Sequence, residues 1–433
     1  MEKLNRTIPP VFHTIDKVNL LKSKQMELSN KIPMHIINGG SQEVVKIEFV
    51  FQAGIWFQES KVIAAMTNSM LNEGTFTMNA HQIAEKLDYY GAYLGFTTNT
   101  HSATVTLYSL NKYLDHTLPI VEDVIKNSNF PEKEFNTILN NKKQNYIVEH
   151  QKTKILAKDS FLALLYGKEH PYANNIQESD FDKVTRDKLV TYHKQHYTPS
   201  NCRIIIAGKI TPEVITQLEE KFGETAWPAT KSQAYSSHNQ QDTSPQKIHI
   251  EKKDSVQSAI RIGRKLFNKT HPDYIGMQLL NMVLGGYFGS RLMSNIREDK
   301  GYTYSIGSIH VPYPEGGHFV ILTEVGTQVC SEALKEIYFE IARLRNELIP
   351  EEELELVKNY ITGEILRNLD GPFALSESLR SNLPYGMDNS YYQDFLTGIR
   401  KISAEKLREL ANTYLQEKDL YEIVAGHKEN NSQ

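Results

Sequence analysis

The histidines of this sequence lack the spacing that is typical of a catalytic metal site. Zinc-dependent hydrolysis needs two imidazoles one helical turn apart with a glutamate beside them, as in H-E-x-x-H or H-x-x-E-H. The 15 histidines contain neither arrangement. His193 and His196 have helical spacing and lie near Cys202, but no carboxylate that could be a third ligand is within sequence reach. We therefore interpret this pair as a partly exposed helix end.

Other common catalytic signatures are missing as well. The sequence has no G-x-x-x-x-G-K-[ST], no G-x-G-x-x-G between a strand and a helix, and no G-x-S-x-G. Its two cysteines, Cys202 and Cys330, lie far apart in the sequence and cannot form a disulfide framework or a cysteine-based zinc site. The sequence therefore contains no motif that indicates a phosphate-binding loop or a nucleophilic hydrolase.

One segment does carry chemistry, the stretch LGGYFGSRLMSNIREDKGYTYS over residues 284–305. Arg297 and Tyr304 are seven residues apart in it, and a guanidinium with a phenol can donate to a developing oxyanion. The alternative is that Arg297 pairs with Glu298 or Asp299 and that Tyr304 is a half-buried strand aromatic. Spacing alone favours that alternative. Glycines 285, 286 and 289 allow an anion cradle, a close backbone approach to a peptide or a tight turn.

This segment resembles the second-domain signature of the insulinase/pitrilysin-type zinc peptidases, including the two-domain bacterial enzymes and the mitochondrial processing peptidase. In that signature a glycine-rich turn precedes S-R-L, followed by R-x-x-x-G-x-x-Y-S, and Arg297 and Tyr304 fall on the Arg and the Tyr. The resemblance implies half of a clam-shell peptidase around a chamber for unfolded peptides. It also implies that Arg297 and Tyr304 contact substrate opposite the zinc, while Tyr287 and Phe288 either line the chamber or pack in the core.

The zinc ligands of such peptidases lie in H-x-x-E-H on a helix that ends near Gly-Thr, with a later Glu as third ligand. Counting back from Gly74-Thr75 places this motif on Ala65, Asn68 and Ser69. Alanine has no ligand atom, asparagine is no general base and serine is a poor zinc ligand. Glu149 lies about where the third ligand would be, and we interpret it as solvated or salt-bridged, with a relic ligand as the alternative. We expect this chain to bind no metal or other cofactor.

An internal repeat organises the chain. VTRDKL from Val184 matches ISAEKL from Ile402, and IAG from Ile206 matches VAG from Val424, both at one and the same offset. Pro171-Tyr172 matches Pro384-Tyr385 at a slightly smaller offset, as a short insertion in one half would cause. The shared order predicts two homologous halves.

Each half groups its strands before its longer helices, which favours an α+β fold over a doubly wound one. The pattern predicts two homologous domains, each a mostly antiparallel sheet with helices packed on one face. The alternating residues 44–51 are typical of a half-buried strand. A Ser-, Gln- and Asn-rich stretch then divides a first domain, 1–227, from a second, 247–433, through a linker at 228–246.

The composition limits the classes of partner. The 433 residues include 48 basic and 52 acidic ones, a net charge of -4, which gives no electrostatic case for nucleic acid or an anionic membrane. No apolar run is long enough for a signal-peptide core or a membrane span. We expect a cytoplasmic protein, or a periplasmic one if a signal peptide has been removed.

These observations predict a non-catalytic subunit of a heterodimeric zinc metallopeptidase. The chain would be inactive alone and would supply Arg297 and Tyr304 to a homologous partner that carries H-x-x-E-H, holds the zinc and cleaves unfolded peptides. A homodimer is the alternative assembly when the partner is missing. The alternative function is a structural or peptide-binding scaffold of the same fold with no role in catalysis.

Overall fold

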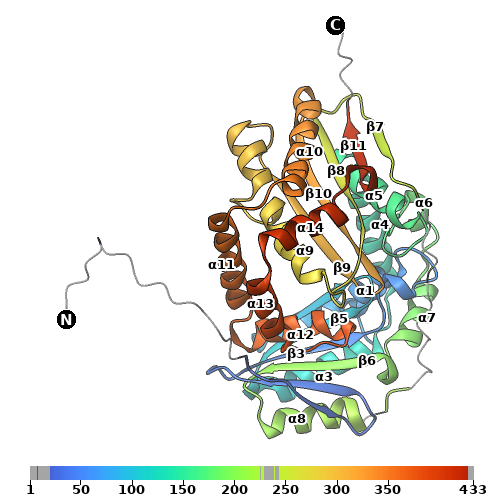
Figure 1. Cartoon of the computed structure of the whole chain (residues 1–433). Helices are drawn as coiled ribbons and strands as arrows, with labels where there is room; N and C mark the ends of the chain where they lie inside the picture. Colours follow the sequence, from blue (N-terminus) through green and yellow to red (C-terminus); the bar gives the residue numbers. More distant parts are fainter. Residues whose placement is uncertain (1–6, 8–19, 225, 229–237, 239–242, 428–433) are drawn as a thin grey trace.

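The chain forms two sheets that lie one above the other in Figure 1. The computed structural model describes residues 7, 20–224, 226–228, 238 and 243–427, so most of the predicted linker 228–246 lies outside the described residues. The first sheet contains β1 (Lys24–Glu27), β2 (Pro33–Asn38), β3 (Val44–Phe51), β4 (Tyr93–Thr98), β5 (Ala103–Leu110) and β6 (Cys202–Gly208). The second contains β7 (Lys247–Glu251), β8 (Gln257–Leu266), β9 (Ile306–Tyr313), β10 (Gly316–Gly326) and β11 (Tyr421–Gly426).

The two sheets have the same topology. The first has the order β1-β2-β6-β3-β5-β4 and the second β7-β11-β8-β10-β9, so the second repeats the first without β1. In each sheet one pair is parallel, β2 with β6 and β7 with β11, and the other neighbours are antiparallel. The predicted α+β fold with two homologous, mostly antiparallel halves is confirmed, whereas the domain boundaries stay a prediction.

Each half contributes its own helices, several of which cover one face of its own sheet. The first half supplies α1 (Ile63–Met70), α2 (Ala80–Tyr89), α3 (Leu114–Asn127), α4 (Glu132–Glu149), α5 (Thr153–Tyr166), α6 (Glu178–Phe181), α7 (Arg186–His196) and α8 (Pro212–Leu218). The second supplies α9 (Tyr274–Asn281), α10 (Cys330–Asn346), α11 (Glu351–Asn368), α12 (Gly371–Asn382), α13 (Tyr391–Lys401) and α14 (Ala404–Tyr414). Apolar side chains of α1, α3 and α7 share one core with the first sheet, and those of α9, α10 and α14 share another with the second.

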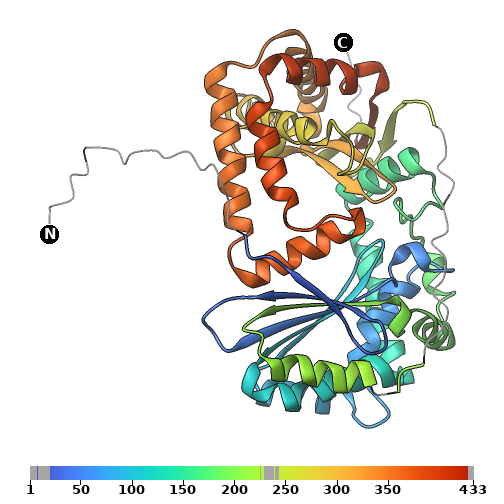
Figure 2. The same ribbon diagram turned by 60° about the horizontal axis from the view of Figure 1, so that its bottom comes forward.

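The opposite face of each sheet is covered by a helix from the other half. Phe161 and Leu165 of α5 pack on Ala259 of β8 and Ile423 of β11. Conversely, α12 packs through residues such as Leu379 on the first sheet, against Ile37, Ile205 and Ala207. Figure 2 shows α12 lying across the blue and green strands of the first sheet. The two helices begin at Thr153 and Gly371, which are separated by the same offset as the repeat, so the exchange is reciprocal.

The interpretation of β3 as a half-buried strand is wrong because α12 covers its polar face. Lys46 and Glu48 are each 1% exposed. The Lys46 ammonium lies 3.0 Å from a carboxylate oxygen of Glu377 and 3.1 Å from the hydroxyl oxygen of Ser376, and the Arg380 guanidinium lies 3.0 Å from Glu48. Buried charges need partners of opposite sign. Lys46 and Glu48 pair with each other at 3.3 Å, and the second half supplies their further partners.

A buried histidine in the layer between the halves makes stability depend on pH. His318 of β10 has its Nδ1 3.1 Å from the hydroxyl of Tyr166 on α5. Burial, with smaller effects from His310 and Arg261, lowers the pKa of His318 to about 4. The unfolded chain therefore takes up the proton at a higher pH than the folded chain does. Stability is lost as the pH falls from about 6.5 to about 4, with no further loss from this group below that window.

We expect His318→Gln to weaken the pH dependence of stability, because the variant no longer takes up a proton at residue 318 on unfolding. A tenfold difference in proton affinity corresponds to about 1.4 kcal/mol. Between pH 7 and pH 4 the wild type should therefore lose roughly 3 kcal/mol more of its free energy of unfolding than His318→Gln does. Urea unfolding at both pH values measures the difference. The control is His81→Gln, whose side chain is 85% exposed. An unchanged pH slope in His318→Gln would contradict the assignment.

Candidate functional site

The helix at the expected zinc position is α1, and its three motif positions serve the fold. The helix follows Val62, which has a left-handed φ of 77° that a β-branched residue adopts only under tertiary constraint. Ala65 is half-buried, and the Ser69 hydroxyl donates to the Met66 carbonyl oxygen at 3.2 Å. Asn68 is 1% exposed, and its Oδ1 accepts a hydrogen bond from the Tyr197 hydroxyl at 3.1 Å.

The bond between Asn68 and Tyr197 explains why a polar residue is tolerated inside the core. Tyr197 is buried, its ring centroid lies 4.7 Å from that of Phe51, and a buried phenol needs a hydrogen-bond partner. Asn68 supplies the acceptor. Tyr197 is a residue that sequence reasoning missed, because nothing in its local sequence marks it as the partner of a helix so much earlier in the chain.

Glu149 is the last residue of α4 and forms an ion pair with Lys152. The hydrogen bond from Lys152 is the main cause that lowers the pKa of this carboxyl group. Just after α1, burial and then the neighbouring Glu134 raise the pKa of Glu73. Glu149 is thus a half-exposed carboxylate with a lysine partner.

The residues at the expected zinc positions do not fit a zinc ion. Ala65 has no donor atom, and the side chains of Asn68, Ser69 and Glu149 are engaged elsewhere. Within the described part of the chain, no group of three or more His, Cys, Asp or Glu side chains is placed to hold a metal.

His193 and His196 do not form a pair. The Nε2 of His193 lies 2.8 Å from the Ile125 carbonyl oxygen, and the Nδ1 of His196 lies 3.2 Å from that of Gln52. Both side chains are buried, so the interpretation as a partly exposed helix end is wrong. Burial lowers the pKa of both, that of His193 to about 4. Each ring ties α7 to a different neighbouring segment.

Arg297 lies in a π-helical turn, Met293–Asp299, before β9. Its guanidinium carbon is 4.5 Å from the ring centroid of Phe288, which is itself exposed. Among the described residues no carboxylate lies within ion-pair distance of Arg297, so the alternative pairing with Glu298 or Asp299 is absent. A cation over an aromatic face is held in position but keeps its outer N–H donors for another partner.

Tyr304 is 92% exposed in the loop that precedes β9, so it is not a half-buried strand aromatic. The start of this loop is fixed by the bond from the Tyr302 amide to the Ile296 carbonyl oxygen at 3.0 Å. The phenol therefore faces solvent on a loop attached to the same turn that carries Arg297.

The glycine-rich turn is required by close packing. A Cβ on Gly285 would lie 2.6 Å from the backbone nitrogen of Ser308 on β9. Gly285 thus lets the turn approach β9. Tyr287 is half-buried and its ring centroid lies 4.9 Å from that of Tyr360, whereas Phe288 is exposed beneath Arg297. The two aromatic residues therefore have different roles, packing for Tyr287 and support of Arg297 for Phe288.

Comparison with known proteins identifies the family. The model described as "Peptidase M16 inactive domain" matches residues 183–361, which include the segment of Arg297. An uncharacterized zinc protease, YmxG of Bacillus subtilis, is 26% identical over 365 residues, 82% of this chain and 86% of the relative. The chain belongs to the insulinase (M16) peptidase family.

Two other M16 relatives differ in what their names state. The non-peptidase homolog YmxG of Helicobacter pylori is 24% identical and aligns over 84% of each chain. A probable mitochondrial-processing peptidase subunit beta of Arabidopsis thaliana is 21% identical, over 85% of this chain and 72% of the relative. The names include both a non-peptidase and a peptidase subunit.

A solved M16 structure has the same fold. The peptidase M16 inactive domain from Pseudomonas fluorescens aligns with a TM-score of 0.83 at 22% identity, covering 94% of this chain and 98% of that one. The prediction of a non-catalytic family member agrees with the description of the matching family model and with the name of the Helicobacter pylori relative. In the described residues, no helix has the length and apolar character needed to cross a membrane.

We expect the isolated chain to hold no stoichiometric zinc, because the four motif positions offer no free ligand set. Elemental analysis of the purified protein after dialysis against dilute zinc measures this. One tightly held zinc per chain that is lost in Glu149→Gln would contradict the expectation.

We expect Asn68→Ala to lower the free energy of unfolding by about 1–3 kcal/mol, because the buried Tyr197 hydroxyl would lose its acceptor. Ser69→Ala, one residue further along, removes only a local bond to Met66 and should change stability by less than about 0.5 kcal/mol. Urea unfolding of both variants measures the contrast. Equal stabilities would show that the Asn68 bond does not support α1.

Proposed function

We propose that this chain is the non-catalytic subunit of a two-chain zinc metallopeptidase and supplies Arg297 and Tyr304 to substrate bound by its partner. The observation that carries the proposal is the contrast between the two motif regions. On α1 the motif positions are occupied by residues that serve packing. In the second region Arg297 is half-buried and Tyr304 is exposed, and no described carboxylate engages their donors.

The proposed chemical role follows from the donors. Hydrolysis of a peptide bond places negative charge on the carbonyl oxygen, and donors aimed at that oxygen or at a neighbouring carbonyl stabilise the transition state. Arg297 offers a permanent cation with fixed N–H directions, and Tyr304 offers a neutral O–H. Phe288 restricts the Arg297 guanidinium to one region, which reduces the entropy lost when substrate binds.

The proposed partner is a homologous chain that carries H-x-x-E-H, holds zinc and provides the attacking water. The proposed substrate is an unfolded peptide enclosed between the two chains. A relative described as a mitochondrial-processing peptidase subunit supports a fold that works as one subunit of an assembly. The chain alone would then have no peptidase activity.

We expect Arg297→Ala or Tyr304→Phe to lower turnover of the reconstituted complex by roughly 10²-fold or more, the scale for loss of one preorganised donor. Assembly should persist, because neither side chain forms an ion pair within the described chain. Peptidase kinetics and analytical ultracentrifugation on the same preparation measure both quantities. Lys300→Ala, an exposed neighbour, serves as the control and should leave turnover unchanged.

Arg291 provides the structural contrast in the same segment. It is buried and forms two hydrogen bonds with Glu353, at 2.9 and 2.8 Å, so Arg291→Ala should cost on the order of 3–5 kcal/mol of stability. If Arg297→Ala destabilises the fold in the same way, Arg297 is structural. If both variants, Arg297→Ala and Tyr304→Phe, retain full peptidase activity, the half-site is wrong and the scaffold function explains the chain better.

A further inference from the structure

The two homologous sheets differ at one edge. In the first sheet β1 pairs antiparallel with β2, from Lys24 opposite Ile36 to Glu27 opposite Pro33. The counterpart of β2 in the second sheet is β7, because each is parallel to the closing strand of its half. Among the described residues β7 pairs with β11 and with no other strand. The position that β1 occupies in the first sheet thus has no described strand in the second.

The backbone of β7 presents hydrogen-bonding groups at this edge. The Gln246 carbonyl oxygen accepts from the Glu422 amide at 2.9 Å, and the Lys252 amide donates to the Gly426 carbonyl oxygen at 3.1 Å. The backbone hydrogen-bonding groups of a strand point alternately to its two sides. The backbone groups of the even-numbered residues from 246 to 252 therefore point toward β11. The N–H and C=O groups of Lys247 and His249 therefore point away from the sheet.

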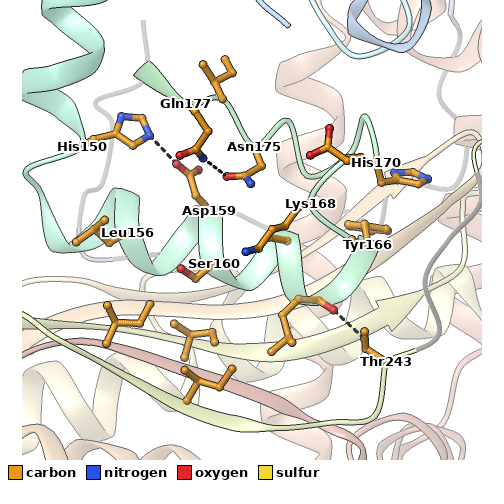
Figure 3. A pocket seen from close by; sticks show the side chains of 18 of the residues that line it. His150, Leu156, Asp159, Ser160, Tyr166, Lys168, His170, Asn175, Gln177 and Thr243 are labelled. Atoms are coloured by element: carbon orange, nitrogen blue, oxygen red, sulfur yellow. Dashed lines mark hydrogen bonds and ion pairs between the residues drawn. The ribbon is translucent and has the colours of Figure 1, made fainter. Parts of the chain in front are cut away.

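A groove of about 1210 Å³ lies beside this edge, with α5 as its floor. The side toward the second sheet is apolar and contains Leu156, Leu164, Ile248, Ile250 and Ile423. Figure 3 shows His150, Gln177 and Asn175 on the other side of α5. The groove thus has one apolar wall, formed in part by the side chains of β7 itself, and one polar wall.

The polar wall is held in place by its own hydrogen bonds. The Nε2 of His150 lies 2.8 Å from an Asp159 carboxylate oxygen and its Nδ1 lies 3.0 Å from the Tyr146 carbonyl oxygen. The Gln177 amide donates to the Asn175 side-chain oxygen at 3.2 Å. A preformed wall of this kind loses little side-chain freedom when a ligand enters.

A buried donor in the groove lacks an acceptor. His170 is 5% exposed and lines the groove. Its Nδ1 accepts from the Tyr172 amide at 3.1 Å, which places the proton on Nε2, and this Nε2 has no partner among the described residues. A buried N–H without an acceptor is costly, so this position of the groove carries an unsatisfied donor.

We propose that β7 binds an extended peptide segment of another molecule as an added antiparallel strand. Alternate side chains of the peptide enter the groove over α5, where the wall formed by Leu156, Leu164 and Ile250 favours apolar residues. Its backbone pairs with the outward-facing groups of Lys247 and His249, as β1 pairs with β2. This site is separate from Arg297 and Tyr304 and does not depend on the proposed peptidase partner.

The test uses the isolated full-length chain and a short fluorescein-labelled peptide of alternating valine and threonine with lysines at both ends. We expect saturable binding by fluorescence anisotropy and slower amide hydrogen exchange at residues 247 and 249. A peptide of the same sequence with N-methylated backbone at alternate positions should not bind, because it cannot donate to β7. Absence of saturable binding would overturn the proposal. This includes the case in which another part of the same chain already occupies the edge of β7 and keeps the peptide out.

Two pairs of variants locate the site. His249→Pro removes an outward N–H without touching the bonds to β11 and should weaken binding by about tenfold or more, whereas His249→Ala keeps the N–H and should bind as the wild type does. Ser160→Trp should fill the groove and abolish binding, and Lys158→Trp, on the exposed side of α5, should not. If His249→Pro fails to fold, Ser160→Trp decides. Unchanged binding in the folded variants would show that the peptide binds elsewhere.

Discussion

Each sheet of this protein has two faces that must be buried, and the helices of each half cover only one of them. The exchange of α5 and α12 between the halves buries the remaining face of each sheet. Because the exchange is reciprocal, removing either helix would expose apolar strand residues of the opposite half. The two homologous halves therefore act as one body, although each has its own topology and core.

The same constraint explains which parts of the fold could be predicted from the sequence. The repeat offset and the alternation in residues 44–51 indicated β3 and the shared order of elements, because these depend on local pattern. The burial of Lys46 and Glu48 could not be predicted, since their partners, Ser376, Glu377 and Arg380, lie in the other half of the chain. The short strands β1, β2 and β7 were missed because few residues define them.

For the candidate site, the sequence carried the identities of the residues but not their surroundings. The absence of zinc ligands at Ala65, Asn68 and Ser69 follows directly from the residue types. The bond of Asn68 to Tyr197 and the stacking of Arg297 on Phe288 are tertiary facts, and no spacing rule predicts them. The main evidence on function is the contrast between α1, whose motif positions serve packing, and the segment of Arg297 and Tyr304, whose donors no described carboxylate engages.

The exchange of α12 also bears on how the chain is made. Synthesis proceeds from the N-terminus, so the whole first sheet, through β6 at Gly208, leaves the ribosome long before α12, which ends at Asn382. Until then Ile37, Ile205 and Ala207 have no helix above them, and Lys46 and Glu48 lack their partners from the second half. Transiently exposed apolar surface of this kind promotes aggregation and recruits chaperones. The nascent first half must therefore remain open or be shielded until translation has passed α12 and only α13, α14 and β11 are still to be made.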